Sequence, residues 1–143
     1  MGARSGGREA ALQILFAVEA TAASAESVAR DYWRELPGDP EGREYAAVLV
    51  AGVMAEREAL DARLSAASKN WRLERMTRVD RNVLRIAAWE LLHQPEPRAV
   101  ILDEAVEMAK RFGTEDSSAF VNGVLTRVAD DSGRAEPHER GDG

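Results

Sequence analysis

The sequence predicts an all-α fold, and three observations support this prediction. Helix-forming residues dominate the chain, and apolar residues recur every three to four positions through most of it. Runs of β-branched residues are short. Most of the 11 glycines and 5 prolines lie between the periodic segments, where they indicate turns. At 143 residues, the chain has the length of one ordinary domain.

The first two predicted helices lie near the N-terminus. Apolar residues at helical spacing predict a helix at about residues 7–21. A second helix is expected at about residues 24–36, with Ser24 or Ser27 as its N-cap. The proline and glycine that follow should end this helix and begin a loop over residues 37–42.

The next two predicted helices should form much of the core. Residues 41–68 have helical periodicity, and the part from 45 to 54 is apolar nearly all round, so we expect it to be buried. Gly52 inside this part costs about 1 kcal/mol relative to alanine, which favours a close helix crossing or a bend nearby. The helix expected at residues 78–92 is apolar over most of its circumference and should be central.

Two further helices and a tail complete the prediction. Residues 100–112 form a clear amphipathic pattern, and Gly113 suits the C′ position after it. Thr114 or Asp116 can cap the last helix, whose apolar residues continue to Val128. We therefore expect one helical domain at residues 1–130. Residues 131–143 should form a disordered acidic tail, because they offer no apolar face to bury.

Composition argues against several classes of function. The chain has no cysteine, and its histidines are His93 and His138, which leaves little scope for zinc sites or thiol chemistry. Neither a catalytic constellation nor a Gly-rich phosphate loop is recognisable. We expect no enzyme activity, no cofactor and no metal. The longest uncharged apolar run, residues 45–55, is about half of the ~20 residues that a membrane helix needs.

The N-terminal segment only partly imitates a secretion signal. Arg4 and Arg8 precede an apolar stretch, but Gln13 interrupts that stretch and Glu9 and Glu19 flank it. We interpret it as an amphipathic helix and expect a cytoplasmic protein. The net charge of −6 argues against a protein that coats nucleic acid through bulk electrostatics. Because much of this charge lies in the tail, a local basic surface on the folded part remains open.

Four segments together resemble the NusB family of transcription antitermination factors. They are REAALQILFAVE from Arg8, RVDRNVLRIAAWEL from Arg78, ILDEAVEMAKRFG from Ile101 and SSAFVNGVL from Ser117. The resemblance implies an all-α fold of two packed three-helix groups. It also implies a function: such proteins pair with NusE, a small-subunit ribosomal protein, and the pair binds boxA RNA of nascent ribosomal RNA transcripts. With other Nus factors, the pair promotes read-through by the transcription elongation complex and ribosomal RNA maturation. The free protein is then a monomer or a homodimer.

The resemblance implies RNA contacts at the N-terminus and in the last helix. Arg4 and Arg8 match two positions of an arginine-rich motif that contacts phosphates, although a frayed terminus is the alternative. Fewer arginines than in relatives imply weaker RNA binding. Phe120 lies about 80° from the centre of the apolar face, so it should be at an edge. There it can stack on an unpaired base or serve as a peripheral core residue.

Further candidates have both structural and functional interpretations. Asn122 and Gly123 lie inside a helix, where helix packing is favoured over RNA contact. Arg85 lies among apolar residues, so it either reaches RNA or pairs with a carboxylate such as Glu90 or Glu104.

By resemblance, three residues contact the protein partner: Phe16, Asp80 and Arg81. Asp80 also suits the start of its helix through the helix dipole. Asp116 is first an N-cap and only second a residue that modulates binding. The alternative function is a helical protein-binding adaptor with little RNA affinity, which the acidic charge and the thin arginine motif would favour.

Overall fold

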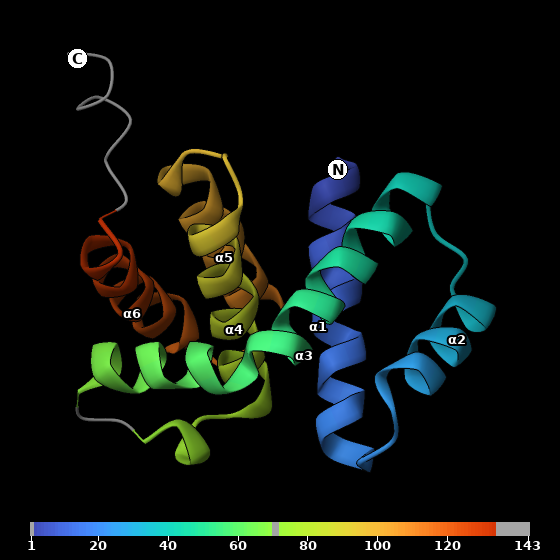
Figure 1. Ribbon diagram of the computed structural model, residues 1–143, viewed down its shortest axis with the longest axis horizontal. Coiled ribbons are helices and arrows are strands. Elements are labelled where there is room, and N and C mark those ends of the chain that lie inside the picture. The colour runs from blue at the N-terminus through green and yellow to red at the C-terminus, as the bar shows by residue number, and fades with distance from the viewer. Residues whose placement is uncertain (1, 70–71, 134–143) are drawn as a thin grey trace. The chain divides into compact units, whose positions relative to one another are not determined.

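The computed structural model describes residues 2–69 and 72–133 (Figure 1). These residues form six α-helices and one short 3₁₀ helix, without any strand among them, which confirms the all-α prediction. The chain divides into two compact units, Met1–Ala55 and Glu56–Gly143. Each unit is described by itself below.

Unit 1 contains α1 (Ala3–Thr21), α2 (Ala25–Glu35) and the first part of α3 (Pro40–Ser68). α1 packs against α2. Ser24 is the N-cap of α2, because its side chain accepts a hydrogen bond from the Ser27 backbone N–H at 3.1 Å. The second helix therefore begins at one of the two predicted caps.

α1 begins four residues before the predicted start at Gly7, because its glycines are part of the helix. Gly7 is buried, and a Cβ atom there would lie 2.8 Å from the Gly42 carbonyl oxygen and 3.1 Å from Tyr45 Cβ. A Cβ at Gly42 would in turn lie 3.3 Å from the Ala3 carbonyl oxygen. The two helices thus approach backbone to backbone, and this packing outweighs the low helix propensity of glycine.

The first part of α3 is buried on one face only, so the prediction that this part is buried holds for that face and not for the other. Tyr45, Leu49 and Val53 are buried, whereas Val48 is 43% and Met54 38% exposed. An uninterrupted apolar run therefore did not mean that neighbours cover every side of the helix.

The bend predicted near Gly52 occurs at Glu56, whose backbone angles of φ −112° and ψ 18° break α3 in its interior. The Glu56 carboxylate is held by α4: Trp89 Nε1 donates to Oε2 at 3.2 Å, and His93 Nε2 lies 2.9 Å from Oε1. The hydrogen bond with His93 lowers the pKa of Glu56, although partial desolvation opposes the shift. A kinked residue is thus tied to the neighbouring helix.

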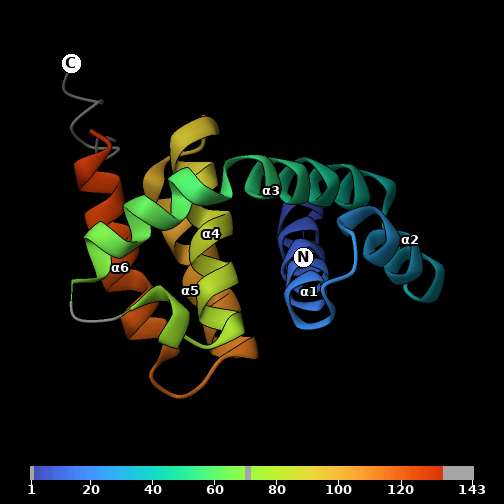
Figure 2. The same ribbon diagram turned by 60° about the horizontal axis from the view of Figure 1, so that its bottom comes forward.

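Unit 2 contains the rest of α3, the 3₁₀ helix η1 (Leu73–Arg75), α4 (Arg78–His93), α5 (Arg98–Phe112) and α6 (Ser117–Asp131). α4, α5 and α6 pack against one another and lie side by side in both views (Figures 1 and 2). Every residue of α4 from 82 to 91 is buried. The prediction that this is a central helix is confirmed.

α6 continues through Asp131, one residue into the predicted tail. Residues 134–143 of the predicted disordered tail lie outside the described residues. Among the helices that the structure describes, none combines the length and the apolar character needed to cross a membrane.

Replacing Gly7 by alanine should destabilise the protein by about 1–3 kcal/mol, because the added methyl group overpacks the contact with Gly42. Gly6→Ala is a matched control on the same helix, since its Cβ would meet no described atom within 4 Å. That control should be neutral or stabilising by up to about 1 kcal/mol through helix propensity. Urea denaturation measures both values, and equal effects of the two substitutions would refute the close crossing.

Glu56→Gln should make the free energy of unfolding less dependent on pH in the acid range. The pKa of Glu56 in the folded protein lies below its ordinary value of 4.5, so the carboxylate contributes stability above that pH. The contribution is lost as pH falls through the lowered pKa. Urea denaturation across this range should show a steeper loss for the parent than for Glu56→Gln. Glu58→Gln, at an exposed residue of α3, should follow the parent.

Candidate nucleic-acid interface

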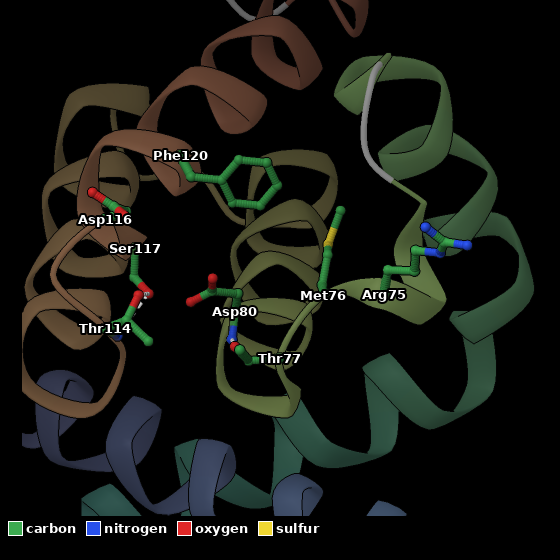
Figure 3. A pocket seen from close by; sticks show the side chains of 8 residues that line it. All are labelled: Arg75, Met76, Thr77, Asp80, Thr114, Asp116, Ser117 and Phe120. Carbon is green, nitrogen blue, oxygen red and sulfur yellow. Dashed lines mark hydrogen bonds between the residues drawn. The ribbon is translucent and has the colours of Figure 1, made fainter.

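A pocket of about 370 Å³ opens in unit 2 where two helix junctions meet (Figure 3). One junction joins η1 to α4, and the other joins α5 to α6. Eight residues line the pocket: Arg75, Met76, Thr77, Asp80, Thr114, Asp116, Ser117 and Phe120. The pocket therefore combines two carboxylates, three hydroxyls, one guanidinium and two large apolar side chains.

The junction of α5 and α6 is fixed by Ser117. Its buried hydroxyl accepts from the Thr114 backbone N–H at 2.9 Å and lies 3.2 Å from Thr114 Oγ1. Gly113 has an extended backbone and no left-handed conformation, and a Cβ there would lie 2.7 Å from Ser117 Cβ. Asp116 occupies the N-cap position without a side-chain capping bond. Asp116 is therefore the N-cap residue, one of the two predicted, although its side chain makes no capping bond, and Gly113 is needed for space.

The opposite wall is fixed by Thr77 and Arg81. The Thr77 hydroxyl caps α4 by accepting from the Asp80 backbone N–H at 3.1 Å. Arg81 Nη1 donates to the carbonyl oxygens of Leu73 and Met76 at 3.0 and 2.9 Å. Arg81 thus holds the η1 turn in place, and its predicted contact with the partner stays a prediction.

Asp80 is the buried polar group of this pocket. Its side chain belongs to a residue that is only 8% exposed, and Oδ1 has no hydrogen-bond partner among the described residues. Most buried polar atoms in proteins are paired, because leaving one unpaired costs about 1–3 kcal/mol. The described residues therefore leave this cost without compensation.

Phe120 is half-buried on the pocket wall, as the predicted edge position requires. Asn122 and Gly123 follow on the exposed side of α6. A Cβ at Gly123 would meet no described atom within 4 Å, so close packing of a neighbouring helix does not explain this glycine. That interpretation is wrong, and the predicted RNA contact of Asn122 stays a prediction.

The two N-terminal arginines differ in accessibility. Arg4 is exposed, with its guanidinium 4.4 Å from the centre of the Tyr45 ring. Arg8 is only 2% exposed and lies 5.7 Å from the same ring centre. Because α1 already begins at Ala3, Arg8 belongs to its second turn and its side chain is buried. This burial leaves the Arg8 side chain little access to a phosphate, and its phosphate contact stays a prediction.

Arg85 forms a buried ion pair. Its Nε and Nη2 atoms donate to Asp61 Oδ1 and Oδ2 at 2.8 and 2.9 Å, and the Arg85 residue is 4% exposed. An RNA contact would have to break this bidentate pair, so the structure favours the ion-pair alternative, and the RNA contact of Arg85 stays a prediction. The alternative to an RNA contact, an ion pair with a carboxylate, is present here with Asp61 on α3.

The other predicted residues remain accessible. Phe16 on α1 is 38% exposed, and Asp116 is exposed at the pocket. Sequence reasoning missed Arg75, because its only signal is spatial: the fold brings η1 to the start of α6. No cluster of three or more potential metal ligands occurs within the part of the chain that the structure describes.

Comparisons with known proteins agree on one family. The model of the NusB family matches residues 5–130. The transcription antitermination protein NusB of Sorangium cellulosum is 65% identical over 137 residues, which cover 95% of this chain and 98% of the relative. The solved structure of T. maritima NusB is 35% identical, covers 97% of this chain and 96% of its own, and superposes with a TM-score of 0.84.

A chain from the crystal structure of antitermination factors NusB and NusE in complex with dsRNA has the same fold. It is 23% identical, with a TM-score of 0.84 and coverage of 92% of this chain and 98% of that chain.

Asp61→Ala should destabilise the protein by about 3 kcal/mol, because it leaves the Arg85 guanidinium buried without this carboxylate. Asp31→Ala is the comparison, since Asp31 pairs with Arg34 at 3.4 Å on the exposed surface. That substitution should cost less than about 1 kcal/mol. Thermal denaturation distinguishes the two, and a small cost for Asp61→Ala would show that the pair is dispensable.

Proposed function

The chain belongs to the NusB family, and we propose that it is a transcription antitermination factor that binds boxA RNA together with NusE. In this role it acts on nascent ribosomal RNA transcripts, within the elongation complex and with other Nus factors, and promotes read-through and ribosomal RNA maturation. Transcription places such a protein in the cytoplasm. The proposal assigns no catalytic step to the chain.

The observation that carries the proposal is the half-buried Phe120 ring in the pocket of unit 2 (Figure 3). An aromatic side chain at the edge of a protein core offers a face on which an unpaired base can stack, at about 1–3 kcal/mol per base. The hydroxyls and carboxylates beside Phe120 can hydrogen bond to the base edge.

Phosphate contacts are fewer than the sequence alone predicted. Arg8 and Arg85 are buried, whereas Arg4 is exposed and Arg75 is exposed where it lines the pocket. With a net charge of −6, the protein has only a weak electrostatic attraction for RNA. We therefore propose that NusE supplies much of the phosphate binding, and that the exposed Phe16 belongs to the protein–protein contact.

A purely protein-binding adaptor is the second candidate function. The burial of Arg8 and Arg85 favours it, because both arginines are unavailable to phosphates. The two candidates differ in one property, which is binding of RNA by the complex with NusE.

Titration of a labelled boxA RNA should show weak binding to the protein alone and markedly tighter binding with NusE. With NusE present, Phe120→Leu should cost about 1–3 kcal/mol of affinity at every salt concentration, because it removes a stacking contact. Arg75→Ala should weaken binding and reduce the slope of log K against log salt by about 0.7, the value for one single-strand phosphate.

Arg34→Ala is the control for loss of positive charge, since Arg34 is already paired with Asp31. It should change neither affinity nor slope. If Phe120→Leu is folded by circular dichroism and binds RNA like the parent, the pocket is not the RNA site. If the complex with NusE binds no RNA, the adaptor function replaces antitermination.

A further inference from the structure

A second pocket, of about 480 Å³, lies within unit 1. It is formed by the start of α1, the end of α2, the loop that follows α2 and the start of α3. Small residues of α1 line one side of it, and aromatic and aliphatic residues of α2 line another. None of these residues lines the pocket of unit 2, so the two pockets are separate sites.

The small side of this pocket depends on Gly6. A Cβ atom at Gly7 would collide with Gly42, but a Cβ atom at Gly6 would meet no described atom within 4 Å. Packing within the protein therefore does not explain a glycine at this position, where alanine would favour the helix. Because Gly6 lines the pocket, its missing side chain leaves space there for a side chain of another molecule.

The opposite side of the pocket is apolar and only partly covered. Leu36 is 54% exposed, and Tyr32 and Trp33 are half-buried. The two rings meet edge to face, with their centres 4.8 Å apart and their planes at 87°. Tyrosine and tryptophan are enriched among the residues that contribute most to protein–protein binding, because rigid rings bury a large area at a low entropic cost.

The charges at this pocket favour a basic protein segment over nucleic acid. Glu35 and Asp39 line it, and neither forms an ion pair with any described residue. Two carboxylates repel phosphates and attract ammonium or guanidinium groups. Arg43 stacks on the Trp33 ring at 5.2 Å and pairs with no described carboxylate, so its N–H groups can donate to the backbone carbonyl oxygens of a bound segment.

We propose that this pocket binds a segment of a protein partner in which an apolar side chain lies between basic residues. The apolar side chain occupies the space beside Gly6 and packs against Trp33 and Leu36. The basic side chains pair with Glu35 and Asp39, which determine the orientation of the segment.

This contact is additional to the one proposed for NusE. α1 contributes Ala3, Gly6 and Ala10 to the pocket, and these residues share one face of the helix. Phe16, which belongs to the proposed contact with NusE, lies about 110° around the helix from that face. The same helix can therefore serve two protein contacts on different sides.

The test measures binding of short labelled peptides to the full chain by fluorescence anisotropy. The first peptide has a leucine flanked by arginines in a glycine–serine background, the second has serine in place of the leucine, and the third has glutamine in place of the arginines. The parent should bind the first about tenfold more tightly than the second, the gain expected from burying a leucine. It should bind the first about fivefold more tightly than the third at low salt, and added salt should reduce this difference.

Gly6→Leu fills the pocket from the protein's own side. It should reduce the preference for leucine over serine to about twofold or less, because the space for the peptide side chain is taken. Gly123→Leu is the matched control, since a Cβ there also meets no described atom within 4 Å and the residue is exposed on α6. This control should keep the full preference. Circular dichroism verifies that both variants are folded.

A second pair of variants tests the charges. Glu35→Gln combined with Asp39→Asn should remove the preference for arginine over glutamine, because both carboxylates at the pocket are neutralised. Glu58→Gln combined with Asp103→Asn changes the net charge by the same amount at two exposed residues away from the pocket. That control should retain the preference, which separates a local contact from general attraction to an acidic protein.

A parent that does not distinguish leucine from serine overturns the proposal, and so does a Gly6→Leu variant that still distinguishes them. A third outcome concerns the other class of partner. If Gly6→Leu leaves peptide binding unchanged but weakens binding of boxA RNA by the complex with NusE, the pocket takes nucleic acid and the proposal is wrong.

Discussion

The near-complete burial of α4 is the constraint on which the rest of unit 2 depends. A helix that is buried from residue 82 to residue 91 leaves its polar side chains little access to water, so each needs a partner within the protein. Arg85 obtains one from Asp61, and Asn82 Nδ2 donates to the Arg78 carbonyl oxygen at 2.9 Å. Asp80, in the first turn, lacks such a partner at Oδ1. The exception lies at the start of the helix, beside the pocket.

In unit 1, packing decides which arginine is available. The glycine contact between α1 and α3 allows α1 to begin at Ala3, and the helical phase then buries Arg8 and exposes Arg4. Residues with low helix propensity thus determine the accessibility of a charged neighbour. A sequence motif shows how many arginines are present. Which of them can reach a phosphate depends on the direction in which each side chain leaves the helix.

The sequence predicted the helices well, because each has its own apolar periodicity and most have recognisable ends, such as Ser24 before α2. It failed where contacts between distant segments decide the outcome. Asp61 pairs with a residue 24 positions away, and no local pattern distinguishes it from other exposed-looking carboxylates. The pocket likewise joins residues 75–80 to residues 114–120, so Arg75 carried no signal in the sequence. Helical geometry predicted the edge position of Phe120, whereas its role as an RNA contact was implied by the resemblance.

An acidic RNA-binding protein must obtain specificity from contacts other than charge. Phosphate contacts add affinity for any sequence, and here several candidates for them are buried. The pocket of unit 2 provides an aromatic ring for stacking and hydrogen-bond acceptors for the edge of a base. The strength of the hydrogen bonds to a base edge depends on the identity of the base. Low charge attraction also limits binding to unrelated RNA, because nonspecific affinity comes almost wholly from phosphates. A basic partner that adds phosphate contacts would then raise affinity without changing which base the pocket accepts.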